Sequence, residues 1–313
     1  MAPIESERPG STGAPVVLLT GASGYVGGRL IPLLETQPVV LRCLARDPDK
    51  LRATVEESTE IVRGDVLDPE SLDEALRGVE TAYYLVHLMS GSTDFEKDDR
   101  RAATNFARAA KQAGVRRIIY LGGLGDDADP GLSPHLRSRH EVGEILRGSG
   151  VETVEFRAGM VVGAGSTSFH LLKSLTDRLP VMLCPRWLAT ETQPIAVDDV
   201  LAYLLAAKDL PSEGNRIFEI GGPDVVTYGD LIREYALQKG LRRWLISVPI
   251  LTPYLSGLWL ALVTPATYEV GRHLIEGLKN PTVVRDKKAL EVFSIRPMGV
   301  KQAIGEAING TTC

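Results

Sequence analysis

The sequence has few cysteines and no excess of positive charge. Its three cysteines among 313 residues, Cys43, Cys184 and Cys313, stand far apart, which excludes a disulfide framework and metal-ligand spacing and favours a reducing compartment. Lys and Arg number 35 against 40 Asp and Glu, and the net charge of −5 gives no reason to expect nucleic acid as a partner. We therefore expect a cytoplasmic protein that binds no metal and no nucleic acid.

The sequence also shows no signal-peptide pattern, and it has one long uncharged segment. Residues 1–14 are polar and rich in Pro and Gly, lack the basic and apolar regions of a signal peptide, and predict a flexible tail. Trp244–Tyr268 carries no charge, and its 19-residue core, Leu245–Val263, is mostly apolar. Because Pro249 and Pro253 interrupt it, we expect a bent helical segment against the core or an apolar pocket rather than a membrane span. Peripheral membrane contact is the alternative.

Short apolar runs alternate with helical patterns through the first half of the chain. The predicted strands are Val16–Thr20, Val39–Ala45, Glu60–Val62, Thr81–Val86, Arg117–Leu121 and Val151–Phe156. The predicted helices are Gly24–Leu34, Pro69–Arg77 with Asp68 as N-cap, Asp94–Ala113 and Pro134–Arg147. Continuous apolar strands alternating with helices predict a parallel sheet covered on both faces, which right-handed crossovers make a Rossmann-type, doubly wound α/β fold.

The pattern becomes irregular after about residue 165. The remaining predicted elements are a strand at Arg216–Ile220 and helices at Asp199–Ala207, Thr227–Leu237 and Tyr268–Leu278. We predict a larger domain at 15–165 and a smaller mixed C-terminal lobe, which binds substrate, at 166–313. Chain crossings between the two parts are expected, so this boundary is approximate.

Three glycines, Gly21, Gly24 and Gly27, form a Gly-x-x-Gly-x-x-Gly pattern between the first strand and the first helix. The first allows a sharp turn, the second allows a pyrophosphate to approach the main chain, and the third allows close packing of helix on strand. The N–H groups at the helix start then bind phosphate. The domain at 15–165 is therefore predicted to bind NAD(P). The predicted loop residues are Gly21, Ser23, Gly24, Tyr25, Val26 and Gly27.

The residue that selects the ribose lies about 20 positions further on, at the end of the second strand. An acidic side chain there accepts hydrogen bonds from the ribose of NAD, but this chain has Arg46, with Arg42 nearby. Because the arginine fork matches a 2′-phosphate, NADP(H) is favoured over NAD(H). The alternatives are that Arg46 is a solvated turn residue, or that Asp47 serves NAD in a register shifted by one.

Later strand ends supply three further predicted cofactor residues. Asp65 and Val66 follow the third strand, where they would contact the adenine, although Asp65 is equally a turn aspartate. Val86 ends the fourth strand, at the same edge of the sheet as the glycine loop.

These stretches resemble the atypical short-chain dehydrogenase/reductase superfamily, in its NmrA-like, NAD(P)-binding branch. The matching segments include "TGASGYVGGRL", "LARDP", "GDVLDPESL", "AAKQAGVRRIIYLGG" and "QPIAVDDVLAYLL", over roughly residues 16 to 208. "FEIGGPDVVTYGDLIREYA" extends the resemblance to about residue 236. The resemblance implies the fold and the cofactor but no particular substrate, and NmrA-like relatives include redox sensors.

One departure from this family concerns the helix after the fifth strand. Short-chain dehydrogenases carry Tyr-x-x-x-Lys there; the tyrosine protonates the carbonyl oxygen and the lysine binds the nicotinamide ribose. Here "SPHLRSRHEVGEILRGSG" contains neither residue. His135 and Arg139 keep the spacing, but counting back from "GEILRGSG" places Leu136 and His140 at the two positions, and we favour this second register. His140 and Arg139 are candidate catalytic residues; each is alternatively a surface residue.

Other candidates stand at strand ends. His87, which ends "YYLVHLMSG", is predicted to be catalytic or to contact substrate, or is a polar residue at a strand end. Tyr83 and Tyr84 are better explained by packing. Arg157 would hold a structural carboxylate or a substrate anion, and Gln193 is a weaker pocket candidate.

The combined prediction is an NADPH-dependent oxidoreductase, a reductase that acts on a small, fairly apolar carbonyl or conjugated substrate without the usual Tyr-x-x-x-Lys relay. One alternative is a non-catalytic NADP-binding redox sensor or regulator. Another is an isomerase or epimerase that retains its cofactor. Nothing in the sequence indicates the oligomeric state.

Overall fold

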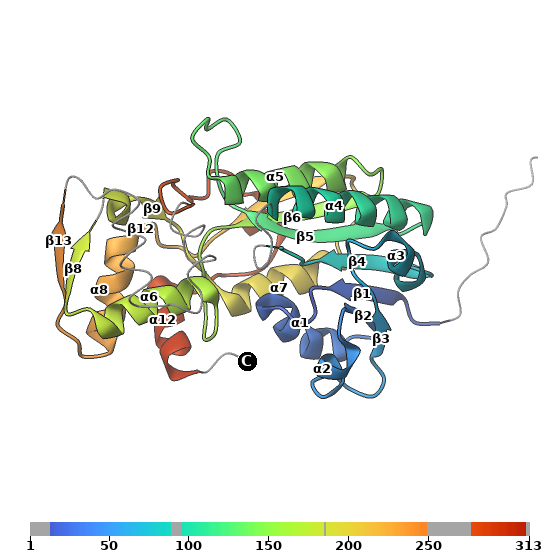
Figure 1. Cartoon of the computed structure of the whole chain (residues 1–313), viewed down its shortest axis with the longest axis horizontal. Helices are drawn as coiled ribbons and strands as arrows, with labels where there is room; N and C mark the ends of the chain where they lie inside the picture. Colours follow the sequence, from blue (N-terminus) through green and yellow to red (C-terminus); the bar gives the residue numbers. More distant parts are fainter. Residues whose placement is uncertain (1–12, 89–94, 185, 249–276, 311–313) are drawn as a thin grey trace, which may run out of the picture.

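A parallel sheet of seven strands organises the computed structural model, which describes residues 13–88, 95–184, 186–248 and 277–310 (Figure 1). The strand order is β11-β6-β5-β4-β1-β2-β3, and every pairing is parallel. The strands are β1 (Val16–Thr20), β2 (Val40–Ala45), β3 (Glu60–Arg63), β4 (Val79–Tyr84), β5 (Arg117–Gly123), β6 (Glu152–Ala158) and β11 (Arg216–Ile220). The predicted doubly wound α/β fold is confirmed, because the order reverses direction between β1 and β4.

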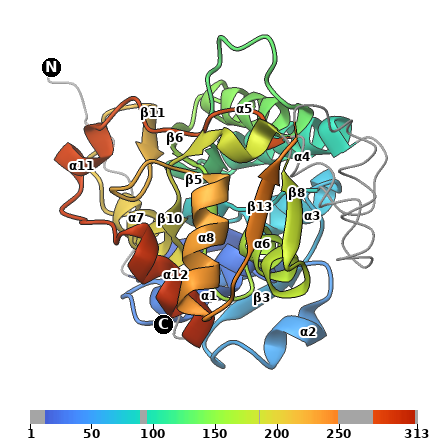
Figure 2. The ribbon, with the colours of Figure 1, turned by 90° about the vertical axis from the view of Figure 1, so that its left-hand side faces the viewer.

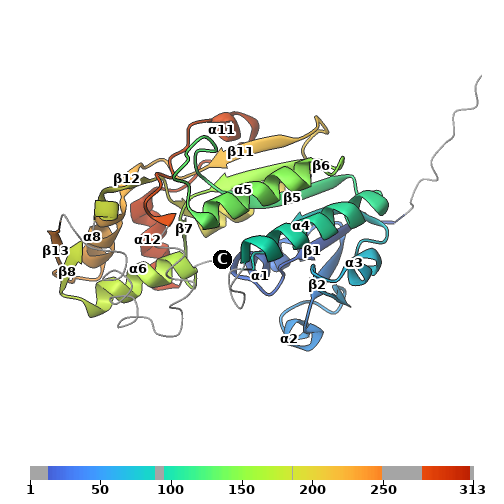
Figure 3. The same ribbon diagram turned by 45° about the horizontal axis from the view of Figure 1, so that its top comes forward.

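Helices cover both faces of the sheet (Figure 3). The helices that accompany the sheet are α1 (Tyr25–Glu35), α2 (Pro48–Arg52), α3 (Pro69–Ala75), α4 (Phe95–Gln112), α5 (Pro134–Arg147), α7 (Val197–Ala207) and α11 (Lys288–Val292). Helices α1 and α7 share one apolar core with one face of the sheet, and α3, α4 and α5 share another with the opposite face. This arrangement explains why the strands are apolar on both sides.

Neighbouring residues of β4 show the two faces directly. Tyr83 belongs to the core under α1 and α7, whereas Tyr84 belongs to the core under α4 and α5. The Tyr83 hydroxyl donates a hydrogen bond to the Leu204 carbonyl at 3.1 Å. Successive side chains of a strand point to opposite faces, so both tyrosines are buried, as the packing interpretation predicts.

Capping side chains define where several helices begin. Asp68 precedes α3 and accepts a hydrogen bond from the Glu70 N–H at 3.2 Å, which confirms it as the N-cap. Ser133 caps α5 in the same way, and Pro134 follows at the first helical position. These local signals account for the close agreement between the predicted and observed start of α5.

A smaller group of elements lies beyond the carboxyl ends of the strands (Figure 1) and faces the viewer in Figure 2. Its helices are α6 (Thr167–Arg178), α8 (Tyr228–Gln238), α12 (Val300–Asn309) and the 3-10 turn η1 (Arg186–Ala189). Its short strands are β7 (Val161–Val162), β8 (Val181–Cys184), β9 (Glu191–Thr192), β10 (Ile195–Ala196), β12 (Val226–Thr227) and β13 (Trp244–Ser247). Residues of α6, α8 and α12 form a third apolar core here.

The chain crosses between these two parts more than once. After α6 and β8 it returns through α7 to β11, which pairs with β6 as the outermost strand of the main sheet. A strand at Arg216–Ile220 is thus confirmed, although it lies in the sheet and not in the smaller lobe where its sequence position placed it. The chain thus returns to the sheet at β11, and the division into two domains at residue 165 stays a prediction.

The uncharged segment Trp244–Tyr268 is described only at its start. Trp244–Ser247 forms β13, which pairs in parallel with β8. Trp244 is 70% exposed and Ile246 is 48% exposed. The predicted bent helical segment, like most of the helix predicted at Tyr268–Leu278, lies outside the described residues. Among the helices that the structure describes, none has the length and apolarity to cross a membrane.

Candidate active site

The glycine loop joins β1 to α1 and is shaped by close main-chain contacts. Gly21 has φ +72°, and a Cβ there would lie 2.5 Å from the Leu85 carbonyl oxygen at the end of β4. The Gly24 N–H donates to the Gly21 carbonyl at 2.9 Å. A Cβ on Gly27 would lie 2.2 Å from that same carbonyl oxygen. Gly21 therefore makes the turn, and Gly27 allows the helix to pack directly on it.

The start of α1 has the character of an anion site. Gly24 is the N-cap, no side chain caps the helix, and the first turn contains no acidic residue. Ser23 and Gly24 are exposed. The first N–H groups of a helix have no intrahelical partner and lie at the positive end of its dipole, so they attract negative charge. These residues fit the diphosphate of a dinucleotide.

The end of β2 lies next to the glycine loop, because β2 pairs with β1 in parallel. Arg46 follows β2 and is exposed, and no hydrogen bond or ion pair holds it within the described part of the chain. Arg42 is already engaged: its Nε lies 2.7 Å from Glu60 Oε2, and its Nη1 donates to two backbone carbonyls near the end of α3. Of these two arginines, Arg46 is the one available to a ligand.

The other predicted cofactor residues lie along the same edge. Asp65 follows β3 and its Oδ1 accepts the Leu67 N–H at 2.9 Å, as expected of a turn aspartate. Val66 is buried in the core beneath α4, and Val86 is partly buried against it. Contact of these residues with an adenine stays a prediction.

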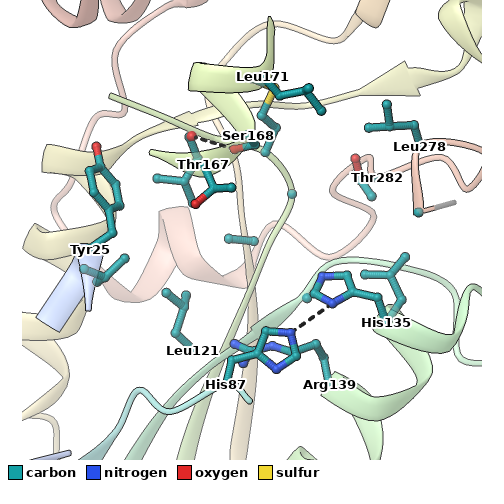
Figure 4. Close-up of a pocket in the computed structure, with 18 of the residues that line it drawn as sticks. Tyr25, His87, Leu121, His135, Arg139, Thr167, Ser168, Leu171, Leu278 and Thr282 are labelled. Carbon is teal, nitrogen blue, oxygen red and sulfur yellow. Dashed lines mark hydrogen bonds between the residues drawn. The ribbon is translucent and has the colours of Figure 1, made fainter. Parts of the chain in front are cut away.

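A cavity of about 490 Å³ opens beside the glycine loop, at the carboxyl ends of β4, β5 and β6 (Figure 4). One wall is made by the loop and α1 through Gly24–Gly27, and the opposite wall by α5. Its far end is formed by the smaller lobe. The lining from the lobe and its neighbours is Met160, Val161, Thr167, Ser168, Leu171, Leu172, Leu175, Tyr228, Ile232, Leu278 and Thr282. Most of these side chains are apolar, as in sites for small organic ligands.

Two histidines meet in this cavity (Figure 4). His87, beyond β4, and His135, in the first turn of α5, approach with His87 Nε2 3.0 Å from His135 Nδ1. On its other side His87 Nδ1 lies 2.8 Å from Asp99 Oδ2 of α4. Asp99 is 2% exposed and also accepts hydrogen bonds from the Leu88 N–H at 2.9 Å and the Ser138 hydroxyl at 3.0 Å. A continuous chain of hydrogen bonds thus joins a buried carboxylate to the cavity wall.

The local environment favours an ionised Asp99 and a neutral His87. Burial lowers the pKa of His87, and the Arg139 guanidinium acts in the same direction, against the hydrogen bond to Asp99, which raises it. Burial alone would raise the pKa of Asp99. The hydrogen bonds from His87 and Leu88, together with the positive charge of Arg139, nevertheless hold the pKa of Asp99 below its usual value.

The face of α5 that lines the cavity distinguishes the two registers of the missing Tyr-x-x-x-Lys. His135 and Arg139 both line it, and so does Leu136. The Arg139 guanidinium lies 5.0 Å from the centroid of the Tyr120 ring. His140 does not line it. The register that we favoured from the sequence therefore places only Leu136 at the cavity, whereas the first register places both members there.

His140 is held by groups of the protein beneath the cavity. It is 5% exposed, its Nε2 lies 2.9 Å from the Gly123 carbonyl oxygen, and its Nδ1 lies 2.6 Å from Asp127 Oδ1. Burial and the charge of Arg157 lower its pKa. It is not the surface histidine of the alternative interpretation. A catalytic role for His140 stays a prediction, and these contacts do not support it.

The two predicted substrate residues are also outside the cavity lining. Arg157 is buried, its Nε donates to Glu155 Oε1 at 2.7 Å, and its Nη1 donates to both Asp127 oxygens at 2.8 and 3.0 Å. This matches the alternative of a structural carboxylate. Gln193 Nε2 donates to the Gly222 carbonyl at 2.6 Å, and its Oε1 accepts a backbone N–H at 2.9 Å. Substrate contact by either residue stays a prediction.

Sequence reasoning missed Asp99 entirely and weighed His135 without keeping it. A signal for Asp99 does exist: it occupies the apolar stripe of α4, four residues after Phe95 and three before Ala102, where an acid is out of place. Within the described ranges, no group of His, Cys, Asp or Glu side chains is arranged to hold a metal ion.

A glycine loop at a helix start, on the carboxyl edge of a parallel sheet and beside an apolar cavity, defines a dinucleotide-binding protein of the Rossmann type. A family model described as NAD(P)H-binding matches residues 21–178. The chain therefore belongs to this NAD(P)H-binding family, as the resemblance stated from the sequence implies.

Reductases are among the proteins similar to this chain. A ceramide reductase from Caulobacter vibrioides is 27% identical over 267 residues, which cover 82% of each chain. A (4-alkanoyl-5-oxo-2,5-dihydrofuran-3-yl)methyl phosphate reductase from Streptomyces griseus is 29% identical and covers 68% of this chain and 70% of its own. The structure of Citrobacter triphenylmethane reductase complexed with NADP(H) shares the fold, with a TM-score of 0.73 at 17% identity over 93% of this chain and 99% of the other.

Proposed function

We propose that this protein is an NADPH-dependent reductase of small, fairly apolar carbonyl or conjugated substrates. The observation that carries the proposal is that one cavity is lined by the glycine loop, by the His87–His135 pair and by apolar side chains of the smaller lobe. A bound NADPH would supply the hydride. The remaining tasks are to bind the cofactor, to hold an apolar substrate and to deliver a proton.

Cofactor binding falls to groups on the carboxyl edge of the sheet. The N–H groups at the start of α1, at Tyr25 and Val26, would hold the diphosphate. Arg46 would contact the 2′-phosphate, since it is exposed and pairs with no described residue. Arg139 would contact the nicotinamide ribose, the role that the lysine has in the family, because it lies four residues after His135 on the face of α5 that lines the cavity.

Substrate binding falls to the end of the cavity formed by the lobe. Leu171, Leu172 and Leu175 of α6 and Ile232 of α8 present apolar surface, and Tyr228 lines the same end. Such a lining favours a substrate with an apolar body and few polar groups. The name of the first relative includes a ceramide, a substrate with a large apolar body, and that of the second an alkanoyl-substituted 5-oxo-2,5-dihydrofuran that also carries a phosphate; the apolar chain of each supports the proposed lining.

Proton delivery falls to the two histidines. Both line the cavity, and a histidine exchanges protons near neutral pH. Helix α5 offers no tyrosine for this purpose. Because the ring nitrogens of His87 and His135 are already hydrogen-bonded to each other, the pair supplies a donor without the Tyr-x-x-x-Lys arrangement.

The test is consumption of NADPH, and separately of NADH, with a panel of apolar aldehydes, ketones, enones and quinones, each product being identified by mass spectrometry. A Leu175→Trp variant would fill the apolar end of the cavity and is expected to raise KM or abolish turnover of the acceptors that wild type reduces. Leu237→Trp, on an exposed site of α8, is the matched control. Binding of oxidised cofactor alone, with no acceptor reduced, would support the redox sensor instead.

A further inference from the structure

We propose that Asp99, buried in α4, is the positioning residue of a proton relay that runs through His87 to His135 at the cavity wall. The inference deepens the proposed reductase function and depends on it only for the identity of the final proton acceptor. The relay itself is a property of three side chains that lie in contact. Its parts come from three different elements: α4, the segment after β4, and α5.

Three hydrogen bonds hold the Asp99 carboxylate in one orientation, which packing alone would not require. Its Oδ1 accepts the Leu88 N–H at 2.9 Å, while its Oδ2 accepts from both the Ser138 hydroxyl at 3.0 Å and His87 Nδ1 at 2.8 Å. Leu88 follows His87 directly in the chain, so the same carboxylate orients both the backbone and the ring of this segment. The surrounding stripe of α4 is otherwise apolar, as at Phe95, Ala102 and Phe106.

These distances determine which ring nitrogens carry hydrogen. An ionised carboxylate only accepts hydrogen bonds, so His87 Nδ1 carries a hydrogen and donates a hydrogen bond to Asp99. In a neutral His87, Nε2 is then an acceptor, and the hydrogen between the two rings belongs to His135 Nδ1. When the pair holds one additional proton, both nitrogens of His87 carry hydrogen, and His135 accepts at Nδ1 while Nε2 carries its proton. The negative charge of Asp99 stabilises this second state.

The protonated pair can pass one proton into the cavity. The Nε2–H of His135 moves to the substrate oxygen, or to the carbon of a reduced double bond, as hydride from NADPH arrives at the other reacting atom. His135 Nδ1 then takes the proton from His87 Nε2. His87 is left neutral, with its Nδ1–H still donated to Asp99. The substrate gains one hydride and one proton, NADPH becomes NADP⁺, and water returns one proton to the pair.

Charges around the His87–His135 pair determine how strongly it holds its additional proton. Among the described residues, the charged and titratable groups that face His87 are Asp99 from α4 and His135 and Arg139 from α5. The rings of Phe95 and His87 pack edge to face, with centroids 6.4 Å apart. Arg139 disfavours the positive state and Asp99 favours it. Removing the charge of Asp99 must therefore lower the pKa of His87.

The first test is NMR of the full chain labelled with ¹⁵N-histidine, which needs no substrate. In the wild type, His87 is expected as the Nδ1–H form at neutral pH, and single His87→Gln and His135→Gln variants assign the signals. In Asp99→Asn, His87 is expected to titrate at lower pH and to lose its fixed tautomer. Asp98→Asn, one residue earlier on α4, is the matched control. A wild-type His87 protonated on Nε2 alone, or an unchanged titration in Asp99→Asn, would overturn the proposal.

The second test separates positioning from folding. With an acceptor that wild type reduces, Asp99→Asn is expected to lower kcat by about 100-fold, the scale of general acid catalysis, while the Kd for NADPH stays within twofold. The alkaline limb of its kcat–pH profile should move to lower pH. Ser138→Ala removes a hydrogen bond from the same carboxylate and keeps its charge, so it should leave the limb in place. Loss of NADPH binding in Asp99→Asn, or an unmoved limb, would show that Asp99 is merely structural.

Together the two tests distinguish a failure of the proposed relay from a failure of the proposed reductase function. If no acceptor on the panel is reduced but the NMR results are as expected, the relay stands and the proposed reductase function is wrong. If acceptors are reduced and Asp99→Asn leaves the His87 titration and kcat unchanged, the reductase function stands and the relay is wrong.

Discussion

Gly27 offers the sharpest test of how the glycine loop is built. An added Cβ would lie 2.2 Å from the Gly21 carbonyl oxygen and 3.2 Å from Ala22 Cα, so Gly27→Ala forces the loop and the helix apart. Gly28 is the matched control, since its Cβ would meet only the Ala22 carbonyl oxygen, at an ordinary 3.4 Å. Both substitutions gain about 1 kcal/mol of helix propensity, so the difference between them isolates the steric clash.

The size of that difference follows from the cost of overpacking. Forcing one extra methyl group into a close contact costs about 1–3 kcal/mol, which corresponds to roughly 5- to 150-fold in the Kd for NADPH if the loop must be in place to bind. Calorimetry should show this loss for Gly27→Ala and no loss for Gly28→Ala, with Tm measured on both. If the two variants bind NADPH equally and melt together, the close approach of Gly27 to Gly21 does not shape the phosphate site.

Three further predictions concern other parts of the chain. Arg46→Ala should weaken NADPH by about tenfold, as expected for a charged hydrogen bond, and leave NADH unchanged in calorimetry; equal effects on both cofactors would refute 2′-phosphate selection. In a Cys313→Ser variant, native protein at pH 8 should show no thiol that reacts promptly with Ellman's reagent. The reason is that burial raises the pKa of Cys43 to about 12 and also raises that of Cys184; rapid colour without denaturant would contradict this. If the exposed Trp244 and Ile246 mediate peripheral membrane contact, flotation with anionic vesicles should be lost in the double serine variant; wild type that does not float rules this contact out.

The parallel sheet could be predicted because its evidence is local. Apolar strand runs, the capping residues Asp68 and Ser133 and the glycines of the loop each act on their immediate neighbours in the chain. The position of β11 could not be predicted in this way. Its sequence indicates a strand at Arg216–Ile220, but which strand it pairs with depends on a return of the chain through α7 to β6.

The site was predictable only in part, for the same reason. The glycine loop is a single contiguous motif, whereas Asp99 reaches His87 across 12 residues and Ser138 across 39. No local pattern encodes such contacts. Arg157 illustrates the converse: a strand-end arginine suggests a ligand, but the neighbouring Glu155 and Asp127 already occupy its guanidinium.

The register of α5 determines which chemistry is available. A shift of one residue turns a helix by about 100°, so 135/139 and 136/140 are different faces although both pairs keep the spacing of Tyr-x-x-x-Lys. The cavity is lined by His135 and Arg139, and in the proposed function this histidine takes the place of the family's tyrosine. A free histidine loses its proton near pH 6.5 and a tyrosine near pH 10. Burial lowers the pKa of His87, as does Arg139, and the carboxylate of Asp99 opposes both, so Asp99 is the group that favours the protonated state of the His87–His135 pair.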